Sequence, residues 1–278
     1  MTNGGGGGRD RLRDRLLVRP GTKVDLGGID PNDTVGWTKE TAGPVMTEDL
    51  ARLTDLQERL WAERRRKILV VLQGMDAAGK GSTVEHVMGA LSPLGCTVHG
   101  FKVPTEVELA HDYLWRVHAR TPGDGEIAIF DRSHYEDVLV VRVLGLAPEE
   151  RWRARYDEIN AFEAVLAAEG TTILKFFLHI GRDEQRQRLQ ARVDDPDKRW
   201  KFRMGDLESR TRWDDYADAY EDALSRCSTP EAPWFVIPAN RKWFRNLAVA
   251  RILSETLEEL DPRFPPPPEP IPDGLVIE

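Results

Sequence analysis

A glycine-rich loop with a single lysine spans residues 74–83 and reads Gly-Met-Asp-Ala-Ala-Gly-Lys-Gly-Ser-Thr. Glycines let backbone N–H groups turn inward around phosphate oxygens, and Lys80 supplies a positive charge for a phosphoryl group in transfer. The pattern predicts a phosphate-binding loop. A glycine-rich turn with a solvated lysine is the alternative, which a preceding buried strand and a following helix disfavour. The loop residues expected to contact phosphate or nucleotide are Gly74, Ala77, Ala78, Gly79, Gly81, Ser82 and Thr83.

Two aspartates are candidate metal ligands. Asp76 lies inside the loop, where a carboxylate repels phosphate unless Mg²⁺ or a basic side chain lies between them. Asp131 follows the apolar stretch 127–130, and the end of such a strand lies beside the loop in an α/β sheet. We expect both aspartates to hold Mg²⁺, with Mn²⁺ as the second candidate ion. An Asx-turn at Asp76 and a surface salt bridge at Asp131 are the non-catalytic alternatives.

The hydroxyl ligand of that metal has two candidates. The usual pattern places Ser or Thr directly after the lysine, but Gly81 occupies this position. Ser82 and Thr83 therefore both stay open as the residue that faces the metal.

Charged residues follow Asp131 closely. Arg132 can neutralise the charge that spreads over a phosphoryl group in transfer. Glu136 and Asp137 lie within the next helical turn, where they extend the metal site, contact the acceptor or simply begin a solvated helix.

A basic segment runs from Arg182 to Arg203, with eight basic and five acidic residues. Arg188 and Arg192 are spaced i,i+4, so a helix presents both on one face. We predict a helical lid over about residues 182–210 whose cations close over phosphates, with Arg192, Arg188, Lys198 and Lys201 as contacts. A solvated charged helix is the alternative. Arg241, Lys242 and Arg245 form a smaller basic group that suits phosphate contact and a solvated helix face equally.

The elements that position these residues alternate between strands and helices. Five apolar stretches predict strands, at 67–73, 97–101, 127–130, 172–179 and 234–237. Helical patterns separate them, among them a helix capped by Thr47, a capping-box helix from Thr105 through Trp115, one helix carrying Leu207 to Tyr220, and a last helix over 243–260. This alternation predicts an α/β fold with a parallel sheet.

Composition narrows the function. The formal charge of -8 argues against a general nucleic-acid binder, although it leaves room for a local polyanion site. The sequence has no long apolar run, which disfavours membrane insertion, and two cysteines suit a reducing cytoplasm. We expect a flexible arm over residues 1–27, one domain over 28–261 and a stiff proline-rich tail over 262–278.

Several sequence blocks, taken in order, resemble the polyphosphate kinase 2 family from about Gly28 to Leu260. They read VVLQGMDAAGKGST, FKVPTEVELAHDYLWR, FDRSHYEDVLVVRV, DDPDKRWKF with DLESRTRWDDYADAYEDAL, and APWFVIPANRKWFRNL. The resemblance implies a P-loop kinase-like three-layer fold, in which helices flank a parallel five-stranded sheet and form a lid. It places the family's loop residues on Asp76 and Lys80, its second motif on Asp131 and Arg132, and a lid arginine on Arg192. Lys102, in the second block, is a further candidate phosphate contact.

The resemblance also implies an activity. A polyphosphate-dependent nucleotide kinase reversibly transfers a phosphoryl group from inorganic polyphosphate to ADP, with Mg²⁺, and AMP and guanine nucleotides are further candidate substrates. Relatives suggest a homo-oligomer, either a dimer or a tetramer. Two alternatives stay open: an ATP-dependent nucleoside-monophosphate or other small-molecule kinase of the same fold, and a nucleotide-gated binding protein.

Overall fold

The computed structural model describes residues 12–277, which form an α/β domain built on a five-stranded parallel sheet. The strand order is β2-β3-β1-β4-β5, and every pairing is parallel. The strands are β1 (Lys67–Gln73), β2 (Cys96–Gly100), β3 (Ile127–Asp131), β4 (Thr171–His179) and β5 (Trp234–Pro238). Each lies within one residue of its predicted position, so the strand prediction and the fold class are confirmed.

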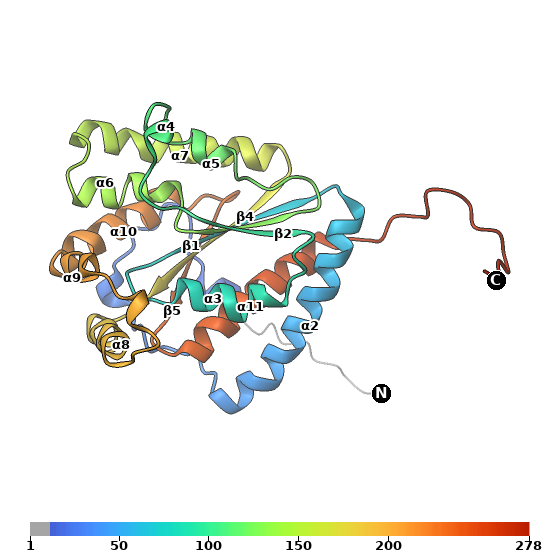
Figure 1. Cartoon of the computed structure of the whole chain (residues 1–278), viewed down its shortest axis with the longest axis horizontal. Helices are drawn as coiled ribbons and strands as arrows, with labels where there is room; N and C mark the ends of the chain where they lie inside the picture. Colours follow the sequence, from blue (N-terminus) through green and yellow to red (C-terminus); the bar gives the residue numbers. More distant parts are fainter. Residues whose placement is uncertain (1–11, 278) are drawn as a thin grey trace.

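Helices cover both faces of this sheet and give three layers (Figure 1). On one face α2, α3 and α11 pack together, and α6, α7 and α10 cover the other. The helices are α1 (Leu12–Leu16), α2 (Lys39–Glu63), α3 (Lys80–His86), α4 (Glu106–Leu109), α5 (Trp115–His118), α6 (Val140–Val143), α7 (Glu149–Ala168), α8 (Arg182–Asp194), α9 (Met204–Thr211), α10 (Trp213–Cys227) and α11 (Lys242–Leu260). Short 3₁₀ helices occur at Leu26–Gly28, Met88–Ala90, His134–Asp137 and Arg199–Lys201.

The central position of β1 explains why this strand is apolar along almost its whole length. Residues Ile68 to Leu72 are fully buried, because helices cover the sheet on both sides. The register aligns Leu72 of β1 with Asp131 of β3. The glycine-rich loop, which leaves the end of β1, therefore begins beside the residue that ends β3.

Local capping explains where the helices differ from the prediction. α2 begins at Lys39 instead of after Thr47, because Thr38 and Thr41 form a reciprocal capping box. The capping box of Thr105 and Glu108 is confirmed, but α4 ends at Leu109. The helix expected to carry Leu207 to Tyr220 is divided into α9 and α10 at Arg212.

The two ends of the described chain differ. Residues 1–11, which include the glycine run of the expected arm, lie outside the described residues. Residues 12–27 do not behave as an arm, because Leu12, Leu16 and Val18 are buried and Leu17 forms a β-bridge with Phe235 of β5. Residues 262–277 are mostly exposed and extend away from the domain, while Glu278 lies outside the described residues (Figure 1). Within the described part, no helix has the length and apolar character needed to cross a membrane.

Candidate active site

The glycine-rich loop joins β1 to α3 and curls at the end of the sheet. Gly79 has φ 112°, a left-handed conformation that glycine adopts without strain, and Ala77 also has positive φ at 63°. Lys80 begins α3 and its Nζ donates hydrogen bonds to the carbonyls of Gly74 (2.6 Å) and Met75 (3.4 Å). Burial, and next the positive charge of Arg132, lower the pKa of Lys80 below the usual value for lysine. The lysine is therefore fixed across the loop, in an environment that favours a negatively charged ligand.

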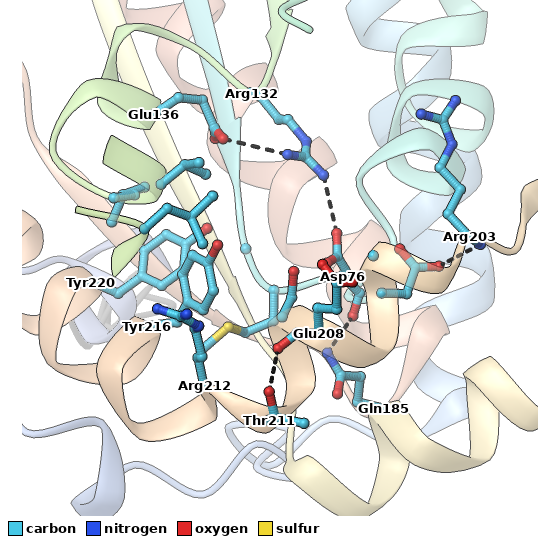
Figure 2. Close-up of a pocket in the computed structure, with 18 residues that line it drawn as sticks. Asp76, Arg132, Glu136, Gln185, Arg203, Glu208, Thr211, Arg212, Tyr216 and Tyr220 are labelled. Carbon is cyan, nitrogen blue, oxygen red and sulfur yellow. Dashed lines mark hydrogen bonds and ion pairs between the residues drawn. The ribbon is translucent and has the colours of Figure 1, made fainter. Parts of the chain in front are cut away.

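Arg132 connects the loop to the end of β3. Its Nη2 donates to Asp76 Oδ1 at 3.0 Å and its Nη1 to Glu136 Oε2 at 3.4 Å, so the guanidinium lies between the two carboxylates (Figure 2). Although burial lowers the pKa of Arg132, the charges of Glu136 and Asp76 outweigh this effect and raise it. Its positive φ of 65° turns the backbone sharply after the strand. This turn directs the arginine toward the loop.

Asp131 lies beside Lys80 in the same hollow as Asp76. Its carboxylate interacts electrostatically with Lys80 and Arg132. Among residues 12–277, no three His, Cys, Asp or Glu side chains cluster into a metal site by themselves. Mg²⁺ commonly uses one or two carboxylates and completes its shell with water and phosphate oxygens. The donor set of Asp76 and Asp131 fits such an ion.

Neither loop hydroxyl joins these carboxylates. Thr83 is buried and its Oγ1 donates to the carbonyl of Gly79 at 3.1 Å, one turn earlier in α3. Ser82 Oγ accepts a hydrogen bond from Arg245 Nη2 at 3.1 Å. Ser82 also lines the hollow with Lys80, whereas Thr83 does not. Of the two hydroxyls, that of Ser82 lies nearer the site.

Two hollows meet at the loop. The first, of about 730 Å³, lies over the loop itself, and among the described residues nine basic and four acidic side chains line it. The basic residues are Lys80, Arg132, Arg188, Arg192, Lys198, Lys201, Arg203, Lys242 and Arg245. We call this space the cationic hollow. Its excess of positive charge suits a polyanion.

The second hollow, of about 470 Å³, lies between the loop, α6, α9 and α10 (Figure 2). We call it the mixed hollow, because apolar side chains such as Leu139 and Tyr216 line it together with three basic and four acidic residues of the described chain. Its volume is typical of a site for a small organic molecule. Asp76, Arg132, Arg203 and Asp206 line both hollows, so two ligands would meet at these residues.

Comparison with known proteins decides the family. The family model for Polyphosphate kinase 2 matches residues 38–265. The chain belongs to the polyphosphate kinase 2 family. It is 55% identical over 266 residues to an AMP/ADP-polyphosphate phosphotransferase of Meiothermus ruber, covering 95% of this chain and 99% of that protein. It is 42% identical to an ADP-polyphosphate phosphotransferase of Rhodopseudomonas palustris, covering 90% and 91% of the two chains.

A solved structure agrees with this assignment. The crystal structure of Polyphosphate Kinase 2 from Arthrobacter aurescens TC1 superposes with a TM-score of 0.90 at 44% identity and covers 94% of both chains. The expected family and the expected fold are therefore confirmed.

The site residues that we predicted from the sequence of this chain fall into three groups, according to the hollow that they line. The first group lines the cationic hollow: Asp76, Ala77, Gly79, Lys80, Gly81, Ser82, Asp131, Arg132, Arg188, Arg192, Lys198 and Lys201. The second group lines the mixed hollow: Gly74, Asp76, Arg132 and Glu136. The third group lines neither: Ala78, Thr83, Lys102 and Asp137. Lys102 is exposed, and the Asp137 carboxylate pairs with Arg155 at 3.1 Å.

Arg188 makes its hydrogen bonds mostly to backbone carbonyls of the loop and of the segment before α11. Its Nη1 donates to the carbonyls of Ala77 (3.1 Å) and Ala78 (3.0 Å), and its Nη2 donates to those of Ala239 (2.7 Å) and Asn240 (3.0 Å). Its Nε pairs with Glu184 at 2.8 Å. The guanidinium is thus occupied by the backbone of the loop and by Glu184, and it supports the loop from α8.

Sequence reasoning missed several lining residues. Asp206, Arg212 and Gln185 line the mixed hollow. Asp206 and Arg212 belong to the block DLESRTRWDDYADAYEDAL, but the block alone does not single them out as site residues, and Gln185 lies in no quoted block. Gln185 Nε2 donates to the carbonyl of Asp76 at 3.0 Å and so connects α8 to the loop. Tyr216 and Tyr220 are buried, as expected for core residues, but they also form a wall of this hollow. Trp200 was not missed, because its place between Arg199 and Lys201 makes it a candidate to stack on a base; it is 76% exposed and lines the cationic hollow.

Proposed function

We propose that this chain transfers phosphoryl groups reversibly between inorganic polyphosphate and adenine nucleotides, making ATP from ADP and ADP from AMP. One observation carries the proposal: a cationic hollow and a mixed hollow meet at Asp76 and Arg132. The names of the relatives from Meiothermus ruber and Rhodopseudomonas palustris support polyphosphate and ADP as substrates. The former name supports AMP as well.

The two substrates occupy different hollows in this proposal. Polyphosphate, a polymer of negative charge, binds in the cationic hollow against Lys80 and the basic residues of α8 and α11. The acceptor nucleotide binds in the mixed hollow, where Leu139, Val140 and Tyr216 provide apolar surface for a base. The phosphoryl group is then transferred at the boundary between the two hollows, where Arg132 lies.

The chemistry needs no general base. A phosphate acceptor has its second pKa near ~6, so it is already ionised at pH 7. The site must instead overcome the repulsion between two polyanions and align them. Lys80 and Arg132 offset the negative charge of the phosphoryl group in transfer, and Asp76 and Glu136 hold the Arg132 guanidinium at the boundary of the two hollows.

The metal in the proposal is Mg²⁺, which Mn²⁺ can replace. Asp76 and Asp131 would hold it, and the bound cation would offset part of the negative charge of the phosphates. Removal of the divalent ion with EDTA is therefore expected to abolish transfer, and added Mg²⁺ is expected to restore it.

Residues 182–210 act as a lid in the proposal. This segment consists of α8, a 3₁₀ helix and most of α9, and it contributes Arg192, Lys198 and Lys201 to the cationic hollow. Arg192 Nη1 lies 3.8 Å from Asp206 Oδ2, so a long ion pair links the first and last helices of the segment. Polyphosphate would compete with Asp206 for this arginine as the lid closes.

The decisive experiment supplies ADP, Mg²⁺ and long-chain polyphosphate without ATP, and follows ATP by chromatography. ATP is expected to form, and parallel reactions with AMP, GDP and GMP measure the acceptor range. The matched control is Asp131→Asn, which keeps the shape of the side chain and removes the proposed metal ligand. Failure of the wild-type chain to make ATP, together with phosphorylation by ATP of another small molecule, would replace the proposal with an ATP-dependent kinase.

Assembly and location remain predictions. Analytical ultracentrifugation at several concentrations tests the expected dimer or tetramer. The cytoplasmic location rests on the sequence alone.

A further inference from the structure

Arg245 is a buried arginine beside the phosphate loop. It lies in the first turn of α11 and only 1% of its surface is exposed. Its Nη1 donates to the carbonyl of Ala78 (3.3 Å), its Nη2 to Ser82 Oγ (3.1 Å), and its Nε and Nη2 to Asn246 Oδ1 (3.1 and 2.8 Å). All these acceptors are uncharged. Within residues 12–277, no carboxylate forms an ion pair with this guanidinium.

This position is unfavourable for a cation. Burial removes the guanidinium from water, and a buried charge without a counter-ion destabilises the fold. The guanidinium of Arg188 donates to the same Ala78 carbonyl, so two like charges lie close together. Burial and the charge of Arg188 lower the pKa of Arg245 to about 10. The start of a helix, which carries partial positive charge, adds to the repulsion. Stability of the fold alone does not account for an arginine at this position.

The loop is shaped to admit this side chain. A Cβ atom on Gly79 would lie 1.8 Å from Arg245 Nη1, so any larger residue at position 79 would displace the arginine. Arg188 and Arg245 both hold the oxygen of the Ala78–Gly79 peptide. Because C=O and N–H point in opposite directions across a trans peptide, the Gly79 N–H points away from the two cations. Cations on the carbonyl also polarise this peptide and strengthen its N–H as a donor.

We propose that Arg245 is a positioning residue for phosphoryl transfer: it fixes the Ala78–Gly79 peptide and Ser82, and its uncompensated charge is balanced when the polyanionic donor binds. This inference rests on the proposed function, which makes inorganic polyphosphate that donor. Arg188 has Glu184 as its counter-ion, whereas Arg245 gains one only with the ligand. The charge that destabilises the empty loop therefore contributes to affinity for the donor.

The experiment compares Arg245→Met, Arg245→Lys and a matched control, Arg241→Met. Arg241 precedes α11, is exposed and lines neither hollow, so its substitution removes the same charge at the surface. Two quantities are measured for each protein: the rise in melting temperature caused by tripolyphosphate with Mg²⁺, and the KM values for polyphosphate and for ADP.

The proposal predicts a specific division of effects. Arg245→Met melts no lower than the wild type without ligand, loses most of the rise caused by tripolyphosphate, and shows a KM for polyphosphate raised about tenfold or more. Its KM for ADP changes less than about twofold, since the mixed hollow does not include Arg245. Arg245→Lys keeps the positive charge but lacks the planar, forked guanidinium. Its rise in melting temperature with tripolyphosphate and its KM for polyphosphate should therefore lie between those of the wild type and of Arg245→Met. Arg241→Met should resemble the wild type in both quantities.

Other results would overturn the proposal. A lower melting temperature of Arg245→Met with an unchanged response to tripolyphosphate would mean that the arginine only packs. If Arg245→Met does not fold, Arg245→Lys provides the test. A wild-type rise in the melting temperature of Arg245→Lys with tripolyphosphate would then refute the role of the guanidinium. A wild-type protein that neither responds to tripolyphosphate nor makes ATP would instead refute the proposed function.

Discussion

Lys175 and Arg245 are both buried cations, but their partners differ. Lys175, on the central part of β4, donates hydrogen bonds to Glu163, to the hydroxyl of Tyr135 and to the carbonyl of Cys227. The carboxylate of Glu163 also accepts from Tyr135 and contacts His134, so the cluster contains its own counter-ion. Arg245, next to the phosphate loop, has only uncharged partners among the described residues.

This difference distinguishes a buried charge that stabilises the fold from a buried charge that serves ligand binding. Although burial raises the pKa of Glu163, the charges of Lys175 and His134 keep it below the usual value, as expected of a carboxylate that stays ionised in the core. The cluster connects α7 to β4 and to the turn after Arg132, and it requires nothing from solution. Arg245 lacks an equivalent carboxylate among the described residues, and in our proposal the bound polyanion supplies its counter-ion. We therefore expect substitutions in the first region to affect stability and substitutions in the second to affect activity.

The largest effect is expected at Arg132. Arg132→Ala removes the guanidinium shared by both hollows and should lower kcat by on the order of a thousandfold, as for other arginines that stabilise phosphoryl transfer. Lys80→Ala should act similarly. The free energy of unfolding, from urea titration of the same proteins, should change little, because the Arg132 side chain is 41% exposed. Strong loss of stability in either variant would remove the proposed distinction between the two regions.

The next effect concerns the paired lysine. Lys175→Met leaves Glu163 buried without its cation and should destabilise the protein by about 3–5 kcal/mol. Replacement of both partners, in Lys175→Met with Glu163→Leu, should recover most of this loss, because no unpaired charge remains. The urea midpoint measures both changes, and the folded fraction of each protein should keep a normal KM for polyphosphate.

A matched lysine on another strand provides the control. Lys67 begins β1 and pairs with Asp124 at 2.9 Å, but the Asp124 side chain is 56% exposed. Lys67→Met should therefore cost less than about 1 kcal/mol. If Lys67→Met and Lys175→Met destabilise the protein equally, burial is not the cause of the larger effect.

The sequence predicted the loop, the strands and the acids at the strand ends, because these depend on local pattern. An apolar stretch followed by glycines specifies strand and loop, and parallel pairing then brings Asp131 beside the loop. Burial of single charged residues depends instead on contacts between distant elements. Arg241 and Arg245 look alike in sequence, yet one is exposed and the other is buried against Ala78, more than 160 positions away.

Arg188 shows the same limit. The spacing of Arg188 and Arg192 correctly places both on one face of α8, which lines the cationic hollow. Only the tertiary packing shows that Arg188 is occupied by four backbone carbonyls, whereas Arg192 reaches toward Asp206. The hydrogen-bond partners of a long side chain are set by the neighbouring elements, so the residue type alone does not determine its role.

The smallest expected effect is a fall in activity at alkaline pH. It distinguishes the phosphate loop from the cluster of Lys175 and Glu163. Because the pKa of Lys80 is lowered, Lys80 loses its charge before an ordinary lysine does as pH rises, and kcat/KM should fall in the same range. The unfolded chain then still binds the proton that the folded loop has released, so the contribution of Lys80 to stability rises while activity falls. Lys80→Arg keeps the charge at high pH and should remove this part of the alkaline limb. Arg245, whose pKa burial and the charge of Arg188 lower to about 10, should contribute to the part that remains near pH 10. A profile of Lys80→Arg that matches the wild type between pH 8 and about 10 would show that the protonation of Lys80 does not control activity.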